Sequence, residues 1–157
     1  MDQMPTASIN LAGVQLTVST EELFRAWLQQ QAAKPVAAPG FAVPALNEGE
    51  RYAGIIMKDG KPSHHLILLA EDGGDLNWAD AKAWALSVGG ELPTRPEQSL
   101  LFANCKDAFE ACWHWSSEAY KDTASYAWSQ NFDNGGQTSS TVYVKLRCRV
   151  VRRVSIQ

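Results

Sequence analysis

The chain has no excess of positive charge. It holds 14 lysines and arginines against 17 aspartates and glutamates, which leaves a formal net charge of −3 at pH 7. Proteins that bind DNA or RNA normally show a basic excess, because they neutralise phosphates with lysine and arginine. We therefore expect no nucleic-acid partner. The one basic segment, Lys145–Arg153 (KLRCRVVRR), has the alternation typical of a strand with one charged face.

Long apolar runs are missing as well. The longest, Leu66–Ala70 (LILLA), suits a buried strand and falls far short of the ~20 residues of a membrane span. The opening residues MDQMPTASIN lack a basic start followed by an apolar core. We therefore expect neither membrane insertion nor a signal peptide.

Cysteine is scarce, with three residues, Cys105, Cys112 and Cys148. At least one cannot pair within the chain, which together with the missing signal peptide favours a reducing compartment. A Cys105–Cys112 disulfide is expected only if the protein is exported or released on a virion. Structural zinc needs four ligands, often from cysteine pairs two to four residues apart. Cys105, Cys112 and His114 do not show that spacing. We interpret the cysteines as small buried apolar groups and expect no metal or cofactor.

The apolar content is nevertheless enough for a core, at 45% hydrophobic residues in a chain of 157. Near the start, Ser8–Val18 has the alternation of a small hairpin or a bent strand. A helix should follow, with Ser19 and Glu22 as its capping box. About three turns are too few for a helix that is stable alone, so its apolar stripe should pack on the main domain or on the same helix of another copy. The stripe comprises Leu23, Trp27 and Leu28.

Proline then marks a boundary between two parts of the chain. Pro35, Pro39 and Pro44 lie in an alanine-rich stretch that is typical of an extended linker. We divide the chain into residues 1–33, a hairpin and helix for attachment or oligomerisation; residues 34–48, a linker; and residues 49–157, the main domain.

The main domain should begin with two strands joined at Asp59–Gly60, a hairpin signal. A helix is expected from the N-cap Asn77 to Gly89–Gly90, since glycine readily ends a helix. Its buried face should comprise Trp78, Ala81, Ala85 and Val88.

A second helix should start at Thr94, with Glu97 completing the capping box and Pro96 in the first turn. Several strands follow, the last in Val142–Val151. Two strands, two helices and further strands predict an α+β domain.

Four ordered motifs carry a resemblance to a known family. They are LPTRPE at Leu92–Glu97, WHWSS at Trp113–Ser117, the pair Ala127–Trp128, and RVVR at Arg149–Arg152. Together they resemble the Lcl C-terminal-like domain, a domain of unknown function in bacterial and phage proteins. The helix–Gly-Gly–Leu-Pro-Thr–helix core is similar to C-type-lectin-like domains. The resemblance covers about residues 50–153 and implies two helices against a twisted, mostly antiparallel sheet.

Three groups of residues bear on what this domain could bind or catalyse. The Glu-Pro-Asn, Gln-Pro-Asp and Trp-Asn-Asp motifs of calcium-dependent sugar-binding lectins are absent, and NFDNGG is better explained as a tight turn than as a calcium site. Cys112 and His114 lack an evident third group to orient them, so we expect no enzyme. Trp115 and Trp78 should be core anchors, whereas Trp128 has polar neighbours and suits a half-exposed, sugar-stacking position.

The candidate site lies in two loops, 118–126 and 133–143, in the region where this fold often presents its ligand-binding side chains. Their tyrosine, serine, asparagine, threonine and glycine residues are typical of adaptable binding surfaces. The candidate contacts are Glu118, Tyr120, Lys121, Asp122, Asp133, Asn134, Gln137, Thr138 and Tyr143.

The resemblance implies a non-enzymatic binding module encoded by a phage or prophage. The first hypothesis is a virion-associated protein that recognises a host-surface glycan or protein, with homo-oligomers through residues 1–33 raising weak binding by multivalency. The alternative is an interaction factor in the host cytoplasm that binds or inhibits a host intracellular protein.

Overall fold

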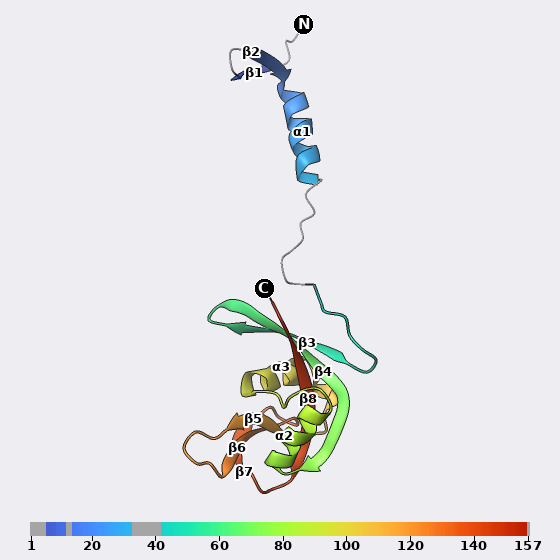
Figure 1. The fold of residues 1–157 in the computed structure, drawn as a ribbon, viewed down its shortest axis with the longest axis vertical. Coiled ribbons are helices and arrows are strands. Elements are labelled where there is room, and N and C mark those ends of the chain that lie inside the picture. Colours follow the sequence, from blue (N-terminus) through green and yellow to red (C-terminus); the bar gives the residue numbers. More distant parts are fainter. Residues whose placement is uncertain (1–5, 12–13, 33–41, 157) are drawn as a thin grey trace. The chain divides into compact units, whose positions relative to one another are not determined.

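The computed structural model describes residues 6–11, 14–32 and 42–156, and the chain divides into two compact units, Met1–Pro39 and Gly40–Gln157 (Figure 1). Ala12 and Gly13, in the middle of the predicted hairpin or bent strand, and residues 34–41 of the predicted linker lie outside the described residues.

The first unit consists of a hairpin followed by a helix. Strand β1 (Thr6–Leu11) pairs antiparallel with β2 (Val14–Ser19), and helix α1 (Thr20–Ala32) follows directly, so the predicted hairpin and helix are confirmed. The Ser19 hydroxyl accepts the N–H of Glu22 at 3.1 Å and also hydrogen-bonds its carboxylate. The predicted cap at Ser19 is therefore present.

The second unit is built on a sheet of six strands, in the order β3-β4-β8-β5-β6-β7. All neighbours pair antiparallel except β5 and β8, which are parallel. The predicted α+β class with a mostly antiparallel sheet is thus confirmed. The strands are β3 (Arg51–Lys58), β4 (Lys61–Leu76), β5 (Trp113–Ala119), β6 (Tyr126–Asn131), β7 (Gln137–Thr141) and β8 (Leu146–Ser155).

The turn between β3 and β4 is the predicted one. Asp59 and Gly60 have φ angles of 51° and 75°. Two successive positive φ values are the requirement of the tight hairpin turn that Asp-Gly favours.

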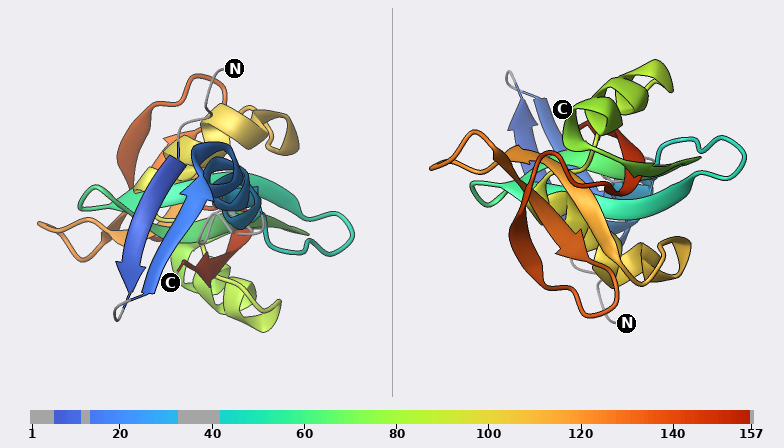
Figure 2. Two further views of the ribbon diagram at one scale, coloured as in Figure 1. Left: turned by 90° about the horizontal axis from the view of Figure 1, so that it is seen from above. Right: turned by 90° about the horizontal axis from the view of Figure 1, so that it is seen from below.

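Two helices cover opposite faces of this sheet, as both views of Figure 2 show. Helix α2 (Trp78–Ser87) packs against a core that includes Trp115 and Val150, and α3 (Arg95–Cys105) against one that includes Leu66 and Phe132. A short 3-10 turn, Lys106–Ala108, extends α3. The sheet therefore has a buried core on each side.

The predicted limits of α2 are confirmed. The side chain of Asn77 accepts the N–H of Asp80 at 3.0 Å, and Ala81 and Ala85 are fully buried. The chain leaves the helix at Gly89, where φ is 85°. A Cβ on Gly90 would lie 2.5 Å from a Val150 methyl, so the chain after the helix approaches β8 too closely for any larger residue.

Both tryptophans expected to anchor the core do so. Trp115 has no exposed surface, and its indole N–H donates to the Leu76 carbonyl at 2.8 Å. The Trp78 indole N–H donates to the Ser116 carbonyl at 2.8 Å. Each ring therefore buries a large apolar area while its one polar atom keeps a partner.

The end of the chain differs from the prediction. The last strand begins at Leu146 rather than Val142, and Gln137–Thr141, expected within a loop, forms the edge strand β7 against β6. The sequence QTSST has no apolar alternation, and none of its residues is fully buried in this edge strand. Hydropathy patterning therefore could not reveal it.

The buried carboxylate of Glu97 connects three elements. It completes the Thr94 capping box by accepting the Thr94 N–H at 2.7 Å. Arg153 of β8 donates to both of its oxygens, at 2.6 and 2.8 Å, and the Nε2 atom of His64 on β4 lies 2.9 Å away. With 1% of Glu97 exposed, this network fixes the first turn of α3 onto the centre of the sheet.

Replacing Glu97 with Gln should lower the free energy of unfolding by about 1.5–3 kcal/mol at pH 7, because Arg153 loses its charge-assisted hydrogen bonds to this carboxylate and keeps only the exposed Glu91 as a counter-charge. Urea denaturation followed by tryptophan fluorescence measures this. The matched control is Asp107→Asn, which breaks an exposed pair with Arg51 and should cost less than about 1 kcal/mol. Equal effects of the two changes would contradict the importance of the network.

The pKa of Glu97 adds a pH signature to the same experiment. Burial raises the pKa, but hydrogen bonds from Arg153 and the Thr94 N–H outweigh this and hold it below its usual range. The stabilisation is therefore complete above the pKa of the unfolded chain, about 4.3, and is lost as the pH falls through the folded value. The difference between wild type and Glu97→Gln should shrink at acidic pH.

Candidate functional site

The nine candidate contact residues do not form one surface. Successive antiparallel strands place the β5–β6 connection (120–125) and the β7–β8 connection (142–145) at one end of β6, and the β6–β7 connection at the other. Asp133 and Asn134 therefore lie apart from Tyr120 and Tyr143 by the length of a six-residue strand, roughly 17–20 Å. The two predicted loops therefore reach opposite ends of β6.

The distant pair forms a self-contained turn. The N–H of Asp133 donates to the Asn131 side chain at 2.8 Å, and the N–H of Gly136 donates to the Asn134 side chain at 2.9 Å. These are Asx turns, as NFDNGG predicts.

Among the described residues of the second unit, the most exposed aromatic side chain lies at the opposite end of β6. Tyr143 is 78% exposed, and Tyr126 is 36% exposed on the neighbouring connection. The N–H of Val142 donates to the Ser125 carbonyl at 2.9 Å, which keeps the two connections side by side. We call the surface of residues 120–126 and 142–145 the tyrosine end. It includes three of the candidates besides Tyr143, namely Tyr120, Lys121 and Asp122.

Glu118 and Gln137 come together around Arg95 of α3, with Gln137 paired to Gln130 near the end of β6 opposite the tyrosine end, and both are engaged within the protein. The Glu118 carboxylate accepts the backbone N–H of Arg95 at 2.8 Å. The Gln137 side chain accepts the Arg95 Nε–H at 3.0 Å and donates to the Arg95 carbonyl at 2.9 Å. They line an open groove of about 310 Å³ with Pro96 and Ser99. Thr138, the remaining candidate, is exposed on β7.

Arg95 is the residue of this region that the sequence did not single out. Its guanidinium carbon lies 3.5 Å from the centre of the Trp128 ring, and the Tyr120 ring centre lies 5.4 Å from that of Trp128. Trp128 is half-buried, as expected, but Arg95 covers one face of the ring and so disfavours sugar stacking there. The sequence feature that could have identified Arg95 is its place in the LPTRPE motif, in the first turn of α3.

Cys112 and His114 do not form a catalytic couple. The imidazole Nδ1–H donates to the backbone carbonyl of Cys112 at 3.1 Å. The ring packs edge-on against Phe109 and Phe132, and burial lowers the pKa of His114 to about 4. Burial also raises the pKa of the Cys112 thiol. At neutral pH both groups are uncharged, and this arrangement cannot supply an activated thiolate.

The three cysteines are free, with Cys105 and Cys148 buried as small core residues. Across residues 6–11, 14–32 and 42–156, no cluster of three or more His, Cys, Asp or Glu side chains could hold a metal ion.

The arginines of β8 serve the fold. Arg147 pairs with Asp72 and Glu110, and Arg152 pairs with Glu50 at 2.7 Å. The Arg149 guanidinium donates to two backbone carbonyls. The basic segment is therefore a structural strand, as its alternation predicts.

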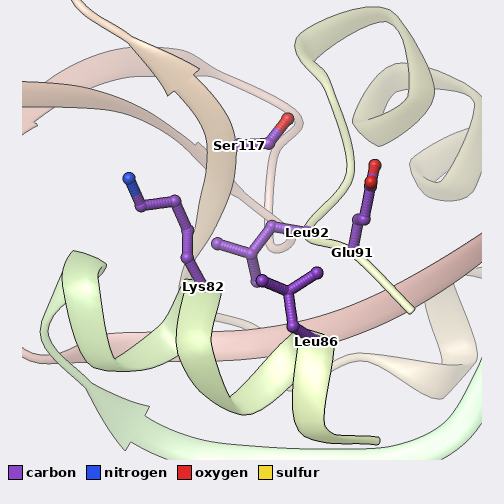
Figure 3. Close-up of a pocket in the computed structure, with 5 residues that line it drawn as sticks. All are labelled: Lys82, Leu86, Glu91, Leu92 and Ser117. Atoms are coloured by element: carbon purple, nitrogen blue, oxygen red, sulfur yellow. The ribbon is translucent and has the colours of Figure 1, made fainter. Parts of the chain in front are cut away.

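A second hollow lies beside α2 (Figure 3). The cavity of about 190 Å³ is lined by Leu86 and Leu92, with Lys82 and Glu91 on either side and Ser117 at its upper edge. Small-molecule sites usually enclose about 300–1,000 Å³, so this hollow would hold little more than one apolar side chain.

Comparisons with protein-family models and with curated proteins both found no match to this sequence. In the described parts of the chain, no helix has the length and apolar character needed to cross a membrane.

The buried imidazole generates a prediction. In the folded protein the His114 ring should stay neutral down to about pH 4, whereas in urea it should titrate near pH 6.5. Because the unfolded chain takes up a proton that the folded chain refuses, His114 should reduce stability progressively as the pH falls from about 6.5 to 4. NMR titration of the imidazole protons measures this, and a folded-state pKa near 6.5 would contradict the burial argument.

Proposed function

We propose that the second unit is a non-enzymatic binding module of C-type-lectin-like fold that recognises a protein surface through the tyrosine end. The high exposure of Tyr143 beside Tyr126 carries this proposal. The order helix α2, Gly89–Gly90, Leu-Pro-Thr, helix α3 on a mostly antiparallel sheet supports the fold assignment.

The residues of the tyrosine end favour a protein over a sugar. A tyrosine offers a large, rigid, amphipathic contact at low entropic cost, and small polar residues around it supply adaptable hydrogen bonds. Exposed Lys121 and Asp122 add charges of both signs at the rim. A sugar site would instead profit from a free indole face, and Arg95 covers one face of Trp128.

The neutral state of Cys112 and His114 supports a binding role. Glu118 and Gln137 then act as positioning residues, because they hold the first turn of α3 against β5 and β7. Because the sequence resembles phage proteins, we take the partner to be a host-surface protein and this chain to be a component of the virion. Mass spectrometry should detect the chain in purified particles; its absence there would favour a host intracellular partner.

Replacing Tyr143 with Ala should weaken partner binding about 30-fold or more, as for a central aromatic contact. The melting temperature should change little, because the side chain is mostly exposed. The partner is first identified by a photo-crosslinking amino acid at position 143, and affinities are then measured by biolayer interferometry.

Met57→Ala is the matched control, since Met57 is 56% exposed at the far hairpin between β3 and β4. It should bind like wild type. Unchanged binding by Tyr143→Ala would refute the site. Binding to a glycan array that Tyr143→Ala abolishes would keep the surface but replace the protein partner by a glycan.

A further inference from the structure

Helix α1 exposes an unusually apolar stripe. Leu23, Phe24, Trp27 and Leu28 are 37–58% exposed, and the Phe24 and Trp27 rings stack with centres 5.9 Å apart. At 3.6 residues per turn these positions cover an arc of about 140°. Such an arc is wider than the narrow seam of a two-stranded coiled coil and suits a helix with more than one neighbour.

In residues 6–11 and 14–32 the described elements of the first unit are this helix and one hairpin, and each is marginal alone. α1 has 13 residues, near the ~12–15 below which isolated helices are marginal in water. The hairpin before it has two strands, and an isolated two-stranded hairpin is also marginal. A partner on the stripe would supply the missing burial.

The charges around the stripe favour an identical partner. Glu21 pairs with Arg25 of the same helix at 2.9 Å, and the Glu22 carboxylate hydrogen-bonds Ser19. The stripe itself carries no charge, so two copies can bring their stripes together without charge repulsion. Helices that lie on membrane surfaces are instead rich in lysine and arginine on the polar face.

The available area is consistent with self-association. A fully buried aromatic side chain covers roughly 150–250 Å², so the half-exposed stripe offers roughly 350 Å² of apolar surface per copy. Homodimer interfaces are about 65% apolar, which implies roughly 550 Å² per copy and 1,100 Å² for a pair. This just exceeds the ~1,000 Å² expected of a specific interface, and a bundle of three or more helices would cover the wide stripe more completely.

We propose that α1 joins copies of this chain through the stripe of Leu23, Phe24, Trp27 and Leu28. The resulting bundle presents several copies of the second unit, which raises the apparent affinity of any weak site they carry. This inference rests on the first unit alone and does not depend on the proposed function.

The test is light scattering coupled to size-exclusion chromatography of the full chain. Wild type should have at least twice the 17.2 kDa mass of one chain, and the double variant Phe24→Ser, Trp27→Ser should be a monomer. The matched control, Ala26→Ser with Gln29→Ser, changes the polar side of the same helix and should remain oligomeric. Every variant should keep the near-UV circular dichroism signal of a folded second unit.

A monomeric wild type would overturn the proposal, as would a double variant that keeps the oligomeric mass. A co-purification experiment gives a second readout: tagged wild type should retain untagged wild type, and tagged double variant should not. If the wild type is monomeric and Trp27 is nevertheless protected from quenching, the stripe packs on its own chain. If it is monomeric and binds neutral vesicles, the stripe binds lipid.

Discussion

The buried carboxylate of Glu97 is the interaction on which the second unit depends. One side chain caps α3, accepts two hydrogen bonds from Arg153 of β8 and contacts His64 of β4. Removing a charge from water is costly unless its partners are complete, and here every neighbouring element supplies one. The first turn of α3 is therefore held in one position over the centre of the sheet.

That position determines the surroundings of the candidate site. Arg95 stands two residues before Glu97, so its guanidinium is delivered onto Trp128 and its backbone N–H onto Glu118. Gln137 binds the same residue from β7. The polar groups nearest the tyrosine end are consequently scaffold, and recognition falls to the residues beyond them, above all Tyr143.

The two units solve the problem of burial differently. The second has a core on each face of its sheet, closed by α2 and α3. In its described residues the first unit has a marginal hairpin, a marginal helix and an exposed apolar stripe, which is the pattern of an element completed by assembly. Multivalent presentation would then join a stable recognition unit to a helix that is stabilised only with its partners.

Local patterns in the sequence determined the hairpin turn at Asp59–Gly60, the caps of α1, α2 and α3, the anchors Trp78 and Trp115, and the α+β class. These depend on dihedral preferences and short-range hydrogen bonds, which neighbouring residues specify. Only the tertiary structure decided the composition of the site. Strand pairing carried Asp133 and Asn134 to the far end of β6, the weakly patterned edge strand β7 emerged from an expected loop, and Arg95 reached Trp128 across 33 residues of chain. Such contacts depend on sheet order and helix placement, which packing of the whole unit sets and no local pattern contains.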